Sequence, residues 1–179
     1  MRNTRSTETE PSDFRSILSP RVRGLARTVL EEADKKDLRI ATAESCTGGL
    51  LSTLLTDLPG VSHCFECGFV VYSDEAKERL LGIPEALIKT HGAVSRPIAI
   101  EMAVRALERS GADLSLSITG FAGSAPSSED EGLVHIALAG ASSKIEHKEC
   151  RFGTVGRDVV RSQALQSALE LLEHTIGVR

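Results

Sequence analysis

Ala43-Glu44-Ser45-Cys46-Thr47-Gly48-Gly49 joins two apolar runs of different character. Residues 38–43 are typical of a buried strand, whereas residues 50–58 have the amphipathic spacing of a helix. A strand that turns directly into a helix presents a hydroxyl and backbone N–H groups at the positive end of that helix. This geometry suits a nucleophile, a phosphate site, or both. The competing interpretation is that Ser45 only caps the helix, because serine is common at that position.

Helical and strand-like segments alternate along the rest of the chain. Apolar periodicity and capping residues predict helices over residues 17–36, 47–57, 74–81, 85–90, 95–110 and 156–175. Strands are predicted over residues 38–43, 64–72, 113–118, 133–139 and 144–152, the last two forming a hairpin. This order predicts an α/β fold, a layered α-β-α sandwich around a mixed, mostly parallel sheet.

Length and composition are those of a folded chain of ordinary size. The 179 residues are 41% hydrophobic and 26% charged, which predicts a single domain over residues 16–179, and residues 1–15 are predicted to be a disordered tail. A net charge of −4 and only 3% aromatic residues argue against nucleic-acid binding. No apolar run is long enough to span a bilayer and no export signal is recognisable, so we expect a cytoplasmic location and no membrane contact.

Cys64 and Cys67 form a C-x-x-C pair, which can indicate redox chemistry or half of a zinc site. No second such pair and no histidine cluster completes a set of zinc ligands in the sequence. The pair also lies in a predicted strand, where positions three apart point to opposite faces. We therefore expect two reduced, structurally inert thiols, with no zinc and no disulfide between them.

Polar side chains follow three of the predicted strands. Ser45 follows the first strand, Tyr72 and Lys77 follow the second, and Thr119-Gly120 follows the third. Ligands of open α/β sheets bind at the carboxyl ends of strands, so we expect these residues to share one cleft. None of the five histidines lies in a recognisable triad context. If Ser45 is a nucleophile, Lys77 is its better candidate base, because burial can lower the pKa of a lysine toward neutrality.

Each of these residues also has a purely structural interpretation. An ion pair with Asp74 on a solvated helix face would account for Lys77. Packing at a strand end would account for Tyr72, and a turn or cap would account for Thr119. From the residues alone, these alternatives stay open.

Five sequence blocks occur together in one order: residues 43–49, Gly68-Phe69-Val70-Val71-Tyr72-Ser73-Asp74-Glu75-Ala76-Lys77, His91-Gly92-Ala93-Val94-Ser95, Ser110-Gly111-Ala112-Asp113 and Thr119-Gly120-Phe121-Ala122-Gly123. With these blocks the chain resembles the CinA C-terminal domain family, the nicotinamide-nucleotide amidohydrolases or NMN deamidases. The resemblance covers residues 17–179 and looks like the stand-alone form, without the larger N-terminal domain of competence-protein fusions. It implies the fold of that family and hydrolysis of the carboxamide of nicotinamide mononucleotide (NMN) to nicotinate mononucleotide and ammonia.

The resemblance also implies roles for individual residues. Ser45 would be the nucleophile and Lys77 its general base, while Tyr72 would assist proton transfer. The substrate-binding residues would be Thr47, Gly48, Gly49, Thr119, Gly120 and Arg157. Among these, Thr119 and the Gly48-Gly49 backbone would lie near the substrate or the oxyanion. No cofactor or metal is implied, and the expected partners are the nucleotide substrate and further copies of the chain.

The resemblance makes Arg157 the candidate phosphate ligand, because the family has an arginine close to a glycine at the start of its last helix and Gly156-Arg157-Asp158 matches it here. From its position alone, it is equally well a surface arginine that pairs with Asp158 or a nearby glutamate.

The chain departs from the family pattern at two places. Where the family usually continues with Pro-Gly-Gly, residues 124–128 are Ser-Ala-Pro-Ser-Ser, followed by three acids, and Cys67 stands where the family often has arginine. If residues 124–131 contact the phosphate, binding is expected to be altered. Two alternatives therefore accompany NMN hydrolysis. The chain would be a divergent member that binds a nucleotide or hydrolyses a different amide, or an interaction module in which Ser45 is only a cap.

Overall fold

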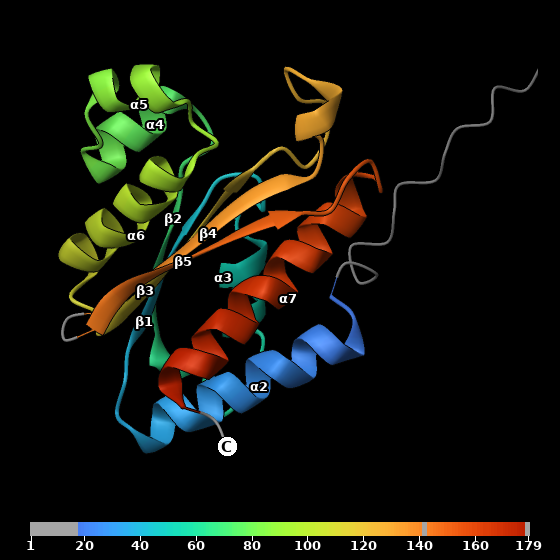
Figure 1. Cartoon of the computed structure of the whole chain (residues 1–179). Helices are drawn as coiled ribbons and strands as arrows, with labels where there is room; N and C mark the ends of the chain where they lie inside the picture. The colour runs from blue at the N-terminus through green and yellow to red at the C-terminus, as the bar shows by residue number, and fades with distance from the viewer. Residues whose placement is uncertain (1–17, 141–142, 178–179) are drawn as a thin grey trace, which may run out of the picture.

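The computed structural model describes residues 18–140 and 143–177, so the predicted tail at residues 1–15 lies outside it. A five-stranded sheet in the order β2-β1-β3-β4-β5 forms the centre of the molecule (Figure 1). Its strands are β1 (Ile40–Glu44), β2 (Phe65–Val70), β3 (Leu114–Gly120), β4 (Leu133–Gly140) and β5 (Ser143–Arg151).

Strand directions confirm the mixed, mostly parallel sheet. β1 is parallel to both of its neighbours, β2 and β3, whereas β4 is antiparallel to β3 and to β5. Four of these five strands therefore run in one direction and β4 is reversed. The carboxyl ends of β1, β2 and β3 consequently lie at the same edge of the sheet, where ligands of such folds bind.

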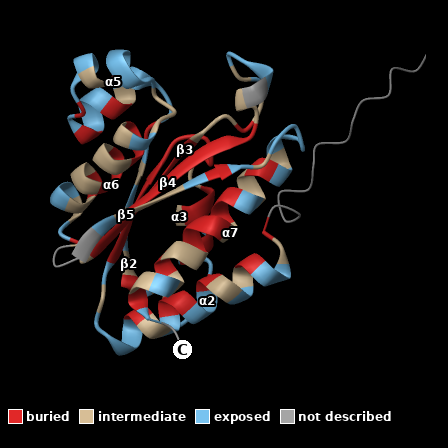
Figure 2. Cartoon of the chain, viewed as in Figure 1, coloured by how far each residue is buried: buried red, intermediate tan, exposed pale blue. Residues whose placement is uncertain are grey.

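Helices cover both faces of the sheet (Figure 1). One face carries α2 (Pro20–Lys35), α3 (Leu50–Thr56) and α7 (Arg157–Ile176), and the other carries α4 (Asp74–Ala76), α5 (Glu85–His91) and α6 (Arg96–Ser110). On the first face a large apolar cluster includes Leu30, Leu51, Leu116 and Leu165. Figure 2 shows the buried residues concentrated on the sheet and on the helix faces turned toward it. The predicted α-β-α layering is confirmed.

Small side chains bring α6 close to the opposite face. Ala99 and Ala103 of α6 pack in one cluster with Ala137 and Ala139 of β4. Ser117 of β3 is fully buried, and its hydroxyl donates to the carbonyl of Ala99 at 2.6 Å. A serine in β3 is therefore satisfied by the helix that covers it, as a buried polar group must be.

The predicted helix over residues 74–81 is not one regular α-helix. Ser73 caps α4 by accepting a hydrogen bond from the Ala76 N–H at 3.1 Å, but the chain then forms a π-helical turn, η2 (Lys77–Leu81). Gly82 ends this turn with φ +70, a conformation that favours glycine. π-helical turns occur frequently at functional sites, and this one begins at Lys77.

Three shorter features complete the fold. A 3-10 turn, η1 (Ser62–Cys64), precedes β2, so the strand predicted to begin at Cys64 begins one residue later. Another 3-10 turn, η3 (Ser128–Asp130), lies within the loop that precedes β4. In the part of the chain that the structure describes, none of the helices combines the length and the apolar character that crossing a membrane requires.

Candidate active site

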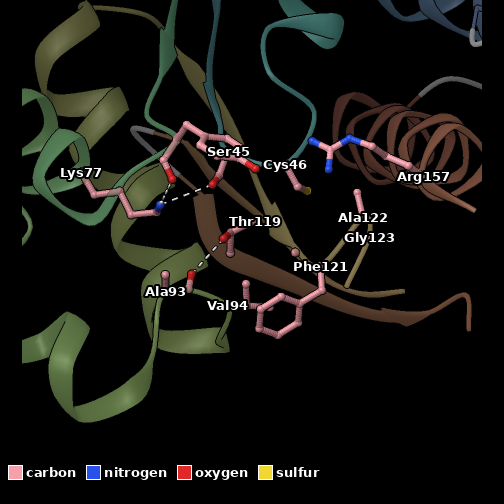
Figure 3. A pocket seen from close by; sticks show the side chains of 12 residues that line it. Ser45, Cys46, Lys77, Ala93, Val94, Thr119, Phe121, Ala122, Gly123 and Arg157 are labelled. Carbon is pink, nitrogen blue, oxygen red and sulfur yellow. Dashed lines mark hydrogen bonds between the residues drawn. The ribbon is translucent and has the colours of Figure 1, made fainter. Parts of the chain in front are cut away.

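A cavity of about 230 Å³ opens where β1 and β3 end (Figure 3). Its wall also includes residues after β2, the loop before α6 and the first residue of α7. The lining residues are Ser45, Cys46, Tyr72, Lys77, Ala93, Val94, Thr119, Gly120, Phe121, Ala122, Gly123 and Arg157. Most of the residues that the sequence singles out therefore meet in one place, although Thr47, Gly48 and Gly49 are not part of this wall.

Ser45 and Lys77 are in direct contact. The Lys77 Nζ donates to Ser45 Oγ at 3.3 Å and to the carbonyl oxygen of Tyr72 at 3.2 Å (Figure 3). The Lys77 side chain is only 1% exposed, and the nearest oxygen of Asp74 lies 4.0 Å away. The interpretation of Lys77 as a solvated helix residue is therefore wrong, because its amine points into the protein toward the serine.

Burial makes Lys77 a weaker base than a free lysine. Loss of hydration lowers the pKa of Lys77 below its ordinary value of 10.5, while the Asp74 carboxylate opposes the shift. A lowered pKa increases the fraction of neutral amine near physiological pH. Since a neutral amine can accept a proton from a hydroxyl, this environment suits general-base chemistry.

Glu44, the residue before Ser45, caps α3. Its fully buried carboxylate accepts hydrogen bonds from the N–H groups of Gly49 at 3.1 Å, Leu51 at 3.0 Å and Ser52 at 2.8 Å. The Ser52 hydroxyl donates to the same carboxylate at 2.6 Å. The interpretation of Ser45 as the helix cap is therefore wrong, and its hydroxyl is left to Lys77. Sequence reasoning missed Glu44, although an acid beside a glycine turn at a helix N-terminus is the available signal.

Gly48 and Gly49 shape the turn between β1 and α3. Their φ angles of +61 and +90 lie in the region that favours glycine. The Gly48 N–H donates to the Ser45 carbonyl at 3.1 Å and the Gly49 N–H donates to Glu44, so both amides are already engaged. Thr47 is fully buried, and its hydroxyl oxygen has no hydrogen-bond partner among the described residues. The helix predicted to start at Thr47 begins at Leu50 instead, because Gly48 and Gly49 have positive φ angles that do not fit a helix.

Thr119 and Gly120, at the end of β3, form the part of the cavity wall next to Ser45. The buried Thr119 hydroxyl donates to the Ala93 carbonyl at 2.8 Å and so ties the end of β3 to the loop before α6. A Cβ atom on Gly120 would lie 2.7 Å from the Leu133 carbonyl oxygen, so the close approach of β4 requires glycine there. Both residues line the cavity while serving the fold.

Tyr72 lines the cavity with a side chain that is 65% exposed. Its contact with the serine–lysine pair is made by its backbone carbonyl, which accepts from Lys77. The ring is therefore not packed into the core at the end of the strand.

Two arginines of α7 contribute to the site or to the turn beside it. Arg157 is the first residue of the helix, and Figure 3 shows its guanidinium directed toward the cavity. One turn further, the Nη2 of Arg161 donates to the Thr47 carbonyl at 2.9 Å, while its buried Nε has no partner among the described residues. Arg161 thus braces the turn that carries Ser45. Sequence reasoning gave it no role, although its i, i+4 spacing from Arg157 placed it on the same helix face.

A second cavity of about 160 Å³ adjoins the first and shares Ala122, Gly123 and Arg157 with it. Ser124 and Glu131, the ends of the loop that departs from the family pattern, line this second cavity. The altered loop therefore lies close to Arg157 and away from the serine–lysine pair.

The family model described as the CinA C-terminal domain matches residues 22–176, which include every residue of this site. The chain belongs to the CinA C-terminal domain family. This CinA-type domain is also similar in structure to the competence/damage inducible protein CihA from Agrobacterium tumefaciens, with a TM-score of 0.84 and 39% identity. That comparison covers 87% of this chain and 96% of the other.

Relatives of this CinA-type domain include both short and long proteins. It is 42% identical over 151 residues to the nicotinamide-nucleotide amidohydrolase PncC of Escherichia coli strain K12, covering 83% of this chain and 90% of that protein. It is 42% identical over 170 residues to a putative competence-damage inducible protein of Caldicellulosiruptor bescii, covering 91% of this chain and 41% of that protein. The chain thus spans less than half the length of the longer relative.

Proposed function

We propose that this protein hydrolyses the carboxamide of NMN to nicotinate mononucleotide and ammonia. The observation that carries the proposal is the buried Lys77 amine, 3.3 Å from Ser45 Oγ, in a cavity that Arg157 also lines. The similarity to an amidohydrolase of E. coli supports the choice of reaction.

Neutral Lys77 takes the hydroxyl proton of Ser45 as Ser45 Oγ attacks the carboxamide carbon. A C–O bond forms, and the electron pair of the C=O bond moves to oxygen. Lys77 then gives its proton to the leaving nitrogen, the C–N bond breaks and ammonia departs. Water attacks the resulting ester with Lys77 again as base, which releases the carboxylic acid product and restores Ser45. Tyr72, exposed beside Lys77, is proposed to assist these proton transfers.

The developing oxyanion requires fixed hydrogen-bond donors. The Gly48 and Gly49 amides are already engaged within the turn, so we propose the backbone amide of Cys46, which lines the cavity beside Ser45, for this role. Arg161, which holds the Thr47 carbonyl, would keep this turn in place. Thr119 and Gly120 complete the opposing wall.

Arg157 is proposed to bind the substrate phosphate. Its helix has 20 residues, and the N-cap Gly156 offers no side-chain acceptor to the first N–H groups. A phosphate there would meet a guanidinium together with the positive end of a helix. Arg157 also lines the second cavity, so the phosphate could occupy either space.

A different amide substrate is the second candidate. Glu131 lines the cavity beside Arg157, and a carboxylate there disfavours an anionic group nearby. A substrate without a phosphate, or with a cationic group, would fit this cavity better than NMN does.

The deciding experiment incubates the purified chain with NMN, and separately with nicotinamide riboside, and measures ammonia and the acid product. Ammonia from NMN supports the proposal. Ammonia from the riboside alone supports the second candidate. No product from either would mean that the site is not an amidohydrolase of pyridine nucleotides.

Ser45→Ala is expected to lower turnover by roughly 10⁴-fold or more, the scale on which removal of a nucleophile acts. Because Glu44 rather than Ser45 caps α3, the free energy of unfolding should change by less than about 1 kcal/mol. Ser62→Ala, in η1 and outside the cavity wall, is the matched control. Near-normal turnover in Ser45→Ala would falsify the assignment of the nucleophile.

A further inference from the structure

Three potential metal ligands converge at the end of the sheet opposite the cavity. The side-chain ligand atoms of Asp34, His63 and Cys64 all lie within 4.8 Å of one another. Cys64 immediately precedes β2, and Phe65 of β2 pairs with Ile40, the first residue of β1. This group therefore lies at the amino ends of these strands, whereas the cavity lies at the carboxyl end of β1.

Local structure places these three residues together. Asp34 is in the last turn of α2, directly after the buried Ala33, and its Oδ1 lies 2.7 Å from His63 Nε2. His63 and Cys64 belong to the 3-10 turn η1, in which the Cys64 N–H donates to the Val61 carbonyl at 3.2 Å. Only 2% of Cys64 is exposed, and its thiol points back to α2, with Sγ 3.8 Å from the Leu30 carbonyl.

A thiolate, an imidazole and a carboxylate together form a ligand set that suits zinc. Zn²⁺ binds sulfur at about 2.3 Å and nitrogen or oxygen at about 2.0–2.2 Å, in four-coordinate geometry. Ligand atoms around one such ion lie roughly 3–4 Å apart, so small rotations of the exposed Asp34 and His63 would complete the arrangement around the fixed thiol. The thiolate and the carboxylate would also neutralise the charge of a divalent ion.

We propose that Asp34, His63 and Cys64 bind a zinc ion, with the fourth position open to water. An ion pair between Asp34 and His63 accounts for their short contact, and the Cys64 thiol lies in the apolar cluster and faces the Leu30 carbonyl. What points to a metal is that the sulfur lies within 4.8 Å of both the carboxylate and the imidazole. The proposal departs from the expectation that Cys64 is inert and that no zinc is bound. It does not use the C-x-x-C pair, because Cys67 lies on β2 outside this group of three. Both cysteines are free in the structure, as an unbridged ligand requires.

Proton competition gives the site a predicted pH dependence. Zinc binds a thiolate and a neutral imidazole, so it must displace protons from these ligands, and its affinity is expected to increase as the pH rises. The catalytic cavity contributes none of these ligands, and failure of either proposal leaves the other standing.

The test uses the full chain, reduced and stripped of metal with a chelator, and titrates it with Co²⁺ and then Zn²⁺. We expect one Co²⁺ per chain, a thiolate-to-cobalt charge-transfer band, and displacement of Co²⁺ by Zn²⁺. Cys64→Ser should lose the band, and His63→Gln should weaken Zn²⁺ binding about 10-fold or more, since even residues that only support a ligand contribute roughly 10–100-fold.

Cys67→Ser is the matched control and should keep both the band and the affinity. His63→Gln and Asp34→Asn change exposed side chains, so they remain informative if Cys64→Ser fails to fold. The absence of a charge-transfer band in the unmodified chain would overturn the proposal. So would an equal loss of binding in Cys67→Ser, or unchanged binding in both His63→Gln and Asp34→Asn.

Discussion

Glu44 and Lys77 are both ionisable and both buried, yet their surroundings differ sharply. The Glu44 carboxylate accepts three backbone N–H groups and one hydroxyl. The Lys77 amine has two neutral oxygens within hydrogen-bond distance and a carboxylate at 4.0 Å. A buried charge is costly unless its surroundings compensate it. Glu44 therefore serves the fold, whereas the surroundings of Lys77 lower its pKa and make its charged form less stable than it is in water.

Lys77→Met should show this difference most strongly. Removal of the proposed base is expected to lower kcat about 10³-fold, within the range for general-base residues. The same change should stabilise the fold by roughly 1–2 kcal/mol, because an apolar chain of similar length replaces a poorly compensated charge. For a chain of this size that corresponds to an increase in Tm of roughly 2–8 °C, measurable by thermal unfolding.

The pH profile provides the control for Lys77. The neutral amine is the active form and the Lys77 pKa is lowered, so the wild-type rate should rise with pH through that lowered value. A decrease in Tm for Lys77→Met, or a rate that is independent of pH where the amine titrates, would contradict the contrast with Glu44.

Glu44→Ala should change stability in the opposite direction. It leaves the N–H groups of Gly49, Leu51 and Ser52 without their acceptor, at a cost of about 3 kcal/mol. Glu44→Gln keeps one acceptor oxygen and is expected to cost about half as much. Urea denaturation measures both changes, and equal stability of Glu44→Ala and wild type would show that the carboxylate does not hold the turn.

Arg157→Ala removes a positive charge whose proposed partner is the phosphate of the substrate. The KM for NMN should rise by roughly 10- to 150-fold, which corresponds to about 1.5–3 kcal/mol for a charge-assisted contact. The KM for nicotinamide riboside should change much less, since that substrate has no phosphate. Arg151→Ala, at the end of β5 and paired with Glu149, is the control. Equal changes for the two substrates would exclude a phosphate contact at Arg157.

Titration of His135 and His147 should have the smallest effect, a modest pH dependence of folding stability. Nδ1 of His135 on β4 lies 3.0 Å from Nε2 of His147 on β5. Burial lowers the pKa of both histidines below 6.5. The unfolded chain then takes up protons first as the pH falls below about 6.5, so folding stability should decrease from there until the lowered pKa values are passed. His147→Gln should flatten this dependence, as measured by urea denaturation between pH 7 and pH 5.

The order of elements was predictable because each carries a local signal. The apolar run of β1 ends in a glycine turn, and the serines at 19 and 95 precede helices that begin with proline at the first or second position. Because ligands of such sheets bind at the carboxyl ends of the strands, the sequence alone predicts that Ser45, Lys77 and Thr119 lie at one edge. Alternation in the Leu-Ser-Leu-Ser-Ile run of β3 correctly indicated a strand, but it could not reveal that α6 buries the serine face as well.

The remaining details depend on contacts between distant segments. Arg161 lies 114 residues from the carbonyl that it holds, and Asp34 lies 29 residues from His63. No local pattern encodes such pairings. The π-helical turn at Lys77 was equally hidden, because its residues fit an ordinary helix.

Strand alternation has a consequence at the end of β1. Ala43 packs with Val71 and Ile98 on the α6 side, whereas the Thr42 hydroxyl meets Ser52 of α3 on the other side. Glu44 and Ser45 continue this alternation, one toward the helix cap and the other toward Lys77. A slip of β1 by a single residue would exchange their directions, placing a hydroxyl under the helix and a carboxylate beside the amine. A chain with this register error would lose both the carboxylate cap of α3 and the contact between serine and lysine. Only correctly paired chains would therefore have the proposed activity.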